Sequence, residues 1–129
     1  MTKKILIVED NEQNMRLFIQ LLQAYGYSTV KSTDGSDVID LVRANNPDLI
    51  IMDIQLPGRS GIEITKDLKS DQNFKHIPII AVTAFAIKGD ENVILEAGCD
   101  DYIAKPINVR VFLETVAKHL SCRGDLKGL

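Results

Sequence analysis

Cysteine is scarce in this sequence, and no apolar run is long enough to cross a membrane. The two cysteines, Cys99 and Cys122, have no metal-ligand spacing around them, so we expect reduced thiols in a cytosolic setting. The first four residues lead into only four apolar residues before Glu9, which is not the pattern of a signal peptide. We therefore expect a cytoplasmic protein that does not insert into a membrane.

An excess of basic residues is also missing. The 15 lysines and arginines are outnumbered by 18 aspartates and glutamates, which gives a formal net charge of -3. Such a chain offers nucleic acid no basic surface, so we expect no nucleic-acid partner. Repeats and low-complexity segments are absent as well, and 129 residues fit one folded domain.

The chain does contain five apolar segments that alternate with five amphipathic segments. Strands are predicted over residues 5–8, 27–32, 49–53, 79–82 and 102–104. The predicted inner faces of the helices are Met15, Phe18, Ile19 and Leu22; Val38, Leu41 and Val42; Ile64 and Leu68; Val93, Ile94 and Ala97; and Val109, Phe112, Leu113, Val116 and Leu120. Because parallel neighbouring strands need crossover connections, this alternation predicts an α/β fold with a parallel sheet and helices on both faces.

Several connecting segments can also be interpreted. The pair Pro57-Gly58 predicts a turn after the third strand, and the fourth helix is predicted over residues 88–97. After Leu120 only SCRGDLKGL follows, so we expect one domain over residues 1–121 and a short tail over 122–129 without an output domain. His76 and His119 have no acidic partner in this pattern, and we expect a loop residue and a helix-face residue.

Asp53 is the first candidate functional residue, because it ends the buried run of the third strand. Ligands bind at the carboxyl ends of the strands in open α/β sheets, although a lone aspartate there is more often simply solvated. The other predicted strands change this interpretation, because they end on Glu9-Asp10, Thr83 and Lys105. If the strands are parallel, these side chains lie along one edge of the sheet.

This combination of side chains predicts a magnesium site and a phosphoryl acceptor. Two carboxylates about 4 Å apart at a surface repel by on the order of 4 kcal/mol, so Glu9, Asp10 and Asp53 predict a bound cation. Oxygen ligands suit Mg²⁺, and the absence of histidine or cysteine argues against zinc. Asp53 could then attack a phosphoryl group and form an aspartyl phosphate, whose oxygens Lys105 and Thr83 would bind. Singly, each residue also has a structural explanation, and only their joint placement favours a site.

These residues carry a family resemblance. Glu9-Asp10, MDIQLPGRSG, AVTAFA and YIAKP resemble the receiver domain of bacterial two-component response regulators, over residues from about 4 to 120. Within this family, IVEDNEQNM, PDLIIMDIQLP, HIPIIAVTAFAIKGDE and FLETV are similar to a single-domain regulator of cell division. The resemblance implies a flavodoxin-like (CheY-like) doubly wound five-stranded parallel sheet in the order 2-1-3-4-5, which brings Asp10 next to Asp53.

The resemblance also implies a role for each residue of the site. Asp53 would be the phosphoacceptor, and Lys105 would pair with the phosphoryl group. The implied Mg²⁺ ligands are Asp10, Asp53 and the main-chain carbonyl of Gln55, with Glu9 reaching the metal through water. Thr83 and Tyr102 would form the switch pair, and the Lys105–Pro106 peptide bond would be cis.

The implied function is signalling rather than the turnover of a small molecule. The chain would accept a phosphoryl group from a histidine kinase and catalyse its own phosphorylation, but it would not be an enzyme with a small-molecule product. The implied partners are sensor histidine kinases, their phosphatases, or phosphotransfer proteins. Output would leave through the surface of the 88–97 helix, the fifth strand and the 109–120 helix.

Two other functions remain open on the same fold. A flavin-binding electron carrier would need donor groups for the flavin phosphate where this chain has the acidic turn Glu9-Asp10-Asn11-Glu12. A phosphohydrolase that forms an aspartyl phosphate would, by resemblance, have a second aspartate two residues after the nucleophile. This chain has Gln55 there. Both alternatives are therefore disfavoured.

Overall fold

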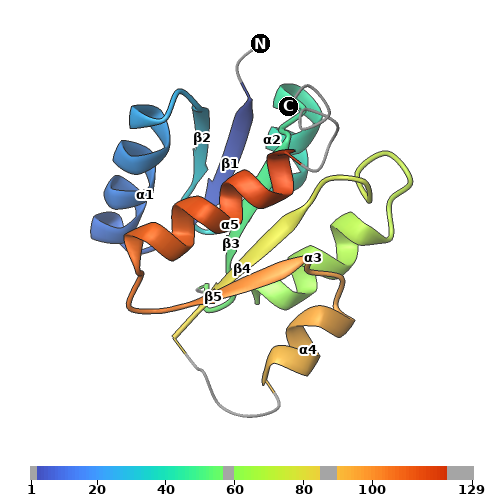
Figure 1. Ribbon diagram of the computed structural model, residues 1–129. Coiled ribbons are helices and arrows are strands. Elements are labelled where there is room, and N and C mark those ends of the chain that lie inside the picture. The colour runs from blue at the N-terminus through green and yellow to red at the C-terminus, as the bar shows by residue number, and fades with distance from the viewer. Residues whose placement is uncertain (1–2, 57–59, 85–89, 122–129) are drawn as a thin grey trace.

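The computed structural model describes residues 3–56, 60–84 and 90–121, which form a parallel sheet covered by helices on both faces (Figure 1). In chain order the elements are β1 (Lys4–Val8), α1 (Glu12–Ala24), β2 (Ser28–Ser32), α2 (Val38–Asn45), β3 (Leu49–Asp53), α3 (Gly61–Lys69), β4 (Ile79–Thr83), α4 (Asp90–Glu96), β5 (Asp101–Ala104) and α5 (Val109–Ser121). The strand order is β2-β1-β3-β4-β5, and all four strand pairs are parallel. The predicted doubly wound fold is therefore confirmed.

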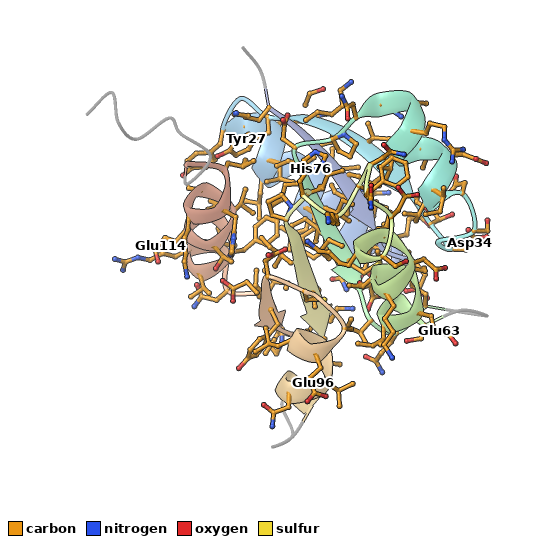
Figure 2. The ribbon with its side chains drawn as sticks, turned by 90° about the vertical axis from the view of Figure 1, so that its right-hand side faces the viewer. Tyr27, Asp34, Glu63, His76, Glu96 and Glu114 are labelled. Carbon is orange, nitrogen blue, oxygen red and sulfur yellow. The ribbon has the colours of Figure 1, made fainter. Side chains whose placement is uncertain are left out.

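The core lies on both sides of the sheet because alternate strand residues point to opposite faces. On one face, Ile5 and Ile7 pack in the same cluster as the buried residues of α1 and α5, where the rings of Phe18 and Phe112 stack with centroids 5.0 Å apart. On the other face, Leu6 joins the cluster that contains residues of α2, α3 and α4. Figure 2 shows side chains filling the space between the sheet and the helices. The central strands are apolar throughout because both of their faces are covered.

Two helix caps fix the loops at the carboxyl ends of the strands. Asn11 begins α1, and its side-chain oxygen accepts a hydrogen bond of 2.9 Å from the backbone N–H of Asn14. Ser60 begins α3, and its hydroxyl oxygen accepts one of 3.1 Å from Ile62. Each cap satisfies a backbone donor that the first helical turn leaves unpaired. Both helices therefore start at defined positions close to Asp10 and Asp53.

The structure corrects some of the sequence-based assignments. β2 begins at Ser28 instead of residue 27, and α4 is described from Asp90 onward. The predicted start of that helix at residue 88, the Pro57-Gly58 turn and the 122–129 tail lie outside the described residues. Within the described residues, no helix combines the length and the apolar character needed to span a membrane.

Two residues assigned to inner helix faces are exposed. Val93 is 52% exposed and Val109 is 44% exposed, so both assignments were wrong. The described part of α4 reaches the core through Ile94, which is only 3% exposed, and the neighbouring Val93 points away from that contact. Val109 is the first residue of α5 and precedes the buried stripe of that helix.

Candidate functional site

Neighbouring strands bring the predicted site residues to one edge of the sheet. Glu9 and Asp53 follow paired residues of the adjacent strands β1 and β3, and Asp10 is the next residue after Glu9. Thr83 ends β4 and pairs with the last residue of β5, which directly precedes Lys105. The predicted convergence is thus a consequence of parallel strands that end in register.

The acidic side chains form a compact cluster with one lysine. One carboxylate oxygen from each of Glu9, Asp10 and Asp53 lies within 4.8 Å of the other two. Glu9 and Asp53 are each 1% exposed, whereas Asp10 is exposed at the surface. The Lys105 Nζ lies 3.5 Å from Glu9 Oε2 and 3.5 Å from Asp53 Oδ2. A single ammonium group therefore faces two buried carboxylates.

Backbone donors satisfy only part of this cluster. Asp53 Oδ1 accepts a hydrogen bond of 2.9 Å from the N–H of Gln55, and Glu9 Oε2 accepts one of 3.1 Å from Asn11. The other oxygen of Glu9, Oε1, is buried and has no hydrogen-bond partner among the described residues. A buried carboxylate oxygen without a partner, next to two further carboxylates, fits a hard cation such as Mg²⁺.

The pKa values of the cluster also reflect that two buried carboxylates share one lysine. Burial and, after it, the charge of Asp53 raise the pKa of Glu9 from 4.5 to about 7, although the Asn11 N–H and Lys105 oppose this shift. Burial also raises the pKa of Asp53, although the Gln55 N–H and Lys105 oppose this shift. Without a metal the pair therefore retains a proton at mildly acidic pH. A bound cation would favour its release.

This pKa shift predicts how folding stability depends on pH. The folded protein keeps a proton on Glu9 that the unfolded chain has already lost, so the stability of the metal-free protein should fall as the pH rises from 4.5 to about 7. Glu9→Gln should remove this fall and be more stable than the wild type by about 1–3 kcal/mol near pH 8. Urea unfolding in the presence of a chelator measures the difference.

A matched variant separates this effect from the simple loss of a negative charge. Glu63 is exposed on α3, where Figure 2 shows it at the outer surface, and Glu63→Gln should leave the pH dependence unchanged. Addition of Mg²⁺ should reduce the advantage of Glu9→Gln, because the cation stabilises the ionised cluster. Equal pH dependence in the wild type and Glu9→Gln would contradict the assignment.

The structure places the two proposed switch residues differently. Thr83 is 3% exposed at the end of β4, beside the edge that carries Asp53. Tyr102 is half-buried in β5 and packs against the core cluster that includes Ile94 of α4. Tyr102 therefore lies outside the acidic cluster and packs beside Ile94 of α4. The Lys105–Pro106 bond is cis, as the resemblance implied.

Two contacts were missed in the sequence. The expectation that His119 has no acidic partner was wrong, because its Nε2 lies 3.0 Å from Asp101 Oδ2. These residues are 18 positions apart, and only the packing of α5 on β5 brings them together. Gly61 packs directly against the main chain of Asp53, and a Cβ atom there would overlap the carbonyl oxygen. A glycine that begins a helix close to a candidate nucleophile was the available sequence signal.

A doubly wound sheet in the order 2-1-3-4-5, with a lysine facing an acidic cluster at its carboxyl edge, defines a class of α/β signalling domains. The chain matches the response regulator receiver domain family over residues 5–117, and it belongs to that family. It is therefore a response regulator protein of two-component signalling, and the flavin-binding alternative is not favoured.

Individual proteins agree with this assignment. The chain is 56% identical over 120 residues to the polar-differentiation response regulator DivK of Brucella ovis, which covers 93% of this chain and 98% of DivK. A putative response regulator from Chloroflexus aurantiacus has a similar structure, with a TM-score of 0.89 and 27% identity over 94% of this chain and 99% of the other. A receiver domain from a Pseudomonas aeruginosa sensor histidine kinase, solved with a magnesium ion coordinated in its active-site cleft, has a TM-score of 0.85 and 31% identity over 94% of this chain and 99% of the other.

Proposed function

We propose that this chain accepts a phosphoryl group on Asp53 from a sensor histidine kinase or phosphotransfer protein and then signals by binding other proteins. The observation that carries the proposal is the position of Lys105, 3.5 Å from the buried carboxylate of Asp53 at the edge of the acidic cluster. An oxygen of Asp53 forms a bond to phosphorus, while the P–N bond of the donor phosphohistidine breaks; the donor ring carries a proton on its other nitrogen, so it leaves as neutral imidazole.

Each residue of the site has a role in this transfer. Asp10, Asp53 and the carbonyl of Gln55 would hold Mg²⁺, with Glu9 reaching it through water. When bound, Mg²⁺ neutralises charge on the phosphoryl oxygens. Lys105 leaves its shared position between the carboxylates and pairs with a phosphoryl oxygen, which compensates the charge that Asp53 gains.

The hydroxyl of Thr83 donates to another phosphoryl oxygen, and Tyr102 responds by changing its packing against α4. Because the acceptor Asp53 belongs to the same site that promotes the transfer, the chain catalyses its own phosphorylation and is not an enzyme that makes a small-molecule product. We assign residues 1–121 to the receiver domain. The similarity to DivK favours a role in cell division, and we place the protein in the cytoplasm.

The direct test is phosphorylation without a partner. The protein is incubated with acetyl phosphate and Mg²⁺, and its intact mass is measured over time. One phosphoryl group per chain is expected, it should require Mg²⁺, and it should be lost at alkaline pH because an aspartyl phosphate is a mixed anhydride. No mass gain, or a gain that is independent of Mg²⁺, would refute the proposal.

Metal binding gives a second prediction. Asp10→Asn should reduce the affinity for Mg²⁺ by at least about tenfold, because it removes a charged oxygen from a cluster whose ligands come from few residues. The fold should be retained because Asp10 is exposed. Titration with Mg²⁺ followed by NMR shifts measures the affinity. An unchanged affinity would place the metal elsewhere on the protein.

A hollow beside Lys105 is the proposed docking site for the phosphodonor. It has a volume of about 530 Å³ and lies between α1 and the segment that follows β5. Its lining residues are Asn14, Leu17, Ala84, Lys105, Pro106 and Ile107. A helix that carries the donor histidine could contact this apolar lining and bring its phosphoryl group to Lys105 and Asp53.

The proposed output surface comprises α4, β5 and α5, where Leu95 and Val111 are 48% and 46% exposed. Tyr102→Ala should uncouple partner binding from phosphorylation, because the ring that packs against the cluster containing Ile94 is lost. Phosphorylation by acetyl phosphate should continue at the wild-type rate. Calorimetry with a candidate kinase, with and without a phosphoryl mimic, measures the coupling. Equal affinities in the wild type for both states would contradict the switch.

A further inference from the structure

Two consecutive aspartates at the start of β5 bind groups that belong to different parts of the fold. Asp100 Oδ2 accepts hydrogen bonds of 3.0 Å from Lys69 Nζ of α3 and 2.8 Å from the backbone N–H of Ile79 in β4. Asp101 Oδ2 instead lies 3.0 Å from His119 Nε2 in the last turn of α5. The strand that carries Tyr102 is therefore attached to α3 by one carboxylate and to α5 by the next.

The carboxylate of Asp101 joins α5 to the main chain of Tyr102. Its Oδ1 accepts a hydrogen bond of 2.9 Å from the Tyr102 N–H, and its Oδ2 faces His119. An ionised carboxylate only accepts hydrogen bonds, so His119 Nε2 must be the donor in this contact. Lys118 Nζ lies 3.8 Å from the same oxygen. Any change at His119 or Lys118 thus acts on the carboxylate that also holds the Tyr102 backbone.

The contact between Asp101 and His119 is partly protected from water, and this strengthens its electrostatic attraction. The side chains of Asp101 and His119 are 28% and 16% exposed, whereas that of Lys118 is 66% exposed. Burial alone would raise the pKa of Asp101, but the hydrogen bonds from His119 and the Tyr102 N–H lower it overall. Asp101 therefore stays ionised at neutral pH.

We propose that Asp101 is a positioning residue that couples the docking of the last turn of α5 to the conformation of Tyr102, so that protonation of His119 and phosphorylation bias each other. This inference rests on the proposed function, in which Tyr102 moves when Asp53 is phosphorylated. Protonated His119 makes a charge-assisted hydrogen bond to Asp101, which is stronger than the bond from neutral imidazole. By linkage, a switch that alters this contact must change the pKa of His119.

The test follows the ring of His119 by NMR during a pH titration of the full chain. The titration is done with Mg²⁺ alone and with Mg²⁺ plus beryllofluoride, a mimic of the aspartyl phosphate. We expect the pKa of His119 to differ between the two states by about 0.5 unit or more. We also expect the amide resonance of Tyr102 to titrate together with His119 in the wild type.

The adjacent aspartate provides the matched control. Asp101→Asn should abolish the joint titration and the difference between the two states, whereas Asp100→Asn should preserve both, even if it is less stable. If Asp101→Asn does not fold, His119→Gln is used, and between about pH 6 and 8 its beryllofluoride affinity should change less with pH than that of the wild type, because the contribution of the acidic cluster remains and that of His119 is lost. An identical pKa of His119 in both states would overturn the inference. Absence of beryllofluoride binding in the wild type would instead count against the proposed function.

Discussion

Replacement of Asp53 by asparagine should abolish phosphorylation by acetyl phosphate while leaving the fold intact. The amide is not a nucleophile at this position, and it also removes one charged oxygen from the acidic cluster. Its oxygen can still accept the hydrogen bond from the Gln55 N–H. Because burial raises the pKa of Asp53, the neutral amide should be at least as stable as the buried carboxylate. Intact mass and urea unfolding measure the two properties.

A second aspartate serves as the control for this substitution. Asp40 is exposed on α2 and forms a surface ion pair with Arg43, at 3.7 Å. Asp40→Asn should be phosphorylated at the wild-type rate with nearly unchanged stability, since such pairs contribute little. If Asp53→Asn still gained a full phosphoryl group at comparable speed, another residue would be the acceptor. The role of Lys105 would then have to be assigned anew.

The residues at the carboxyl edge of the sheet could be predicted from the sequence, because the apolar runs show where each strand ends. Once Leu49 to Met52 are recognised as a strand buried on both faces, Asp53 must lie at its end. Parallel pairing then places the last residue of β4 and the residues that follow β1 and β5 beside it. This argument uses only the order of strands and their ends. It therefore succeeded for Glu9, Asp10, Thr83 and Lys105.

Contacts between helices and strands could not be predicted in the same way. The pattern of α5 correctly indicated Phe112 as a core residue, but the partner of His119 depends on how the helix is rotated and how far it extends along β5. Similarly, Val93 follows the apolar pattern of α4, yet the structure buries Ile94 and Ala97 and leaves Val93 exposed. The periodicity of a helix identifies the face that packs on the core, whereas the packing of neighbouring elements decides which residues that face contacts.

Gly61→Ala should slow phosphorylation more than tenfold, because this glycine sets the position of the nucleophile. Its N–H donates a hydrogen bond of 3.0 Å to the carbonyl of Ile54, so the start of α3 is held against the segment after β3. A Cβ atom on Gly61 would overlap the Asp53 carbonyl oxygen and would lie 2.9 Å from Ile54 Cα. These are main-chain atoms at and just after the end of β3, and they cannot move aside as a flexible side chain can.

The added methyl group therefore has to displace either α3 or the end of β3. Overpacking of this kind costs about 1–3 kcal/mol of stability, and a displacement of Asp53 also disturbs its relation to Lys105 and the Gln55 N–H. Urea unfolding gives the loss of stability. Phosphorylation rates at saturating Mg²⁺, measured where the variant is fully folded, give the loss that is due to positioning alone.

Gly26→Ala separates positioning from general destabilisation. Gly26 has a φ of +89°, and a Cβ atom there would meet nothing within 4 Å. Alanine at that position suffers only backbone strain of about 1–2 kcal/mol, at the opposite end of α1 from Asp10. Gly26→Ala should thus lose stability and keep its phosphorylation rate, whereas Gly61→Ala should lose both. A folded Gly61→Ala protein that is phosphorylated at the wild-type rate would show that the end of β3 adapts to the added methyl group without moving Asp53 out of line.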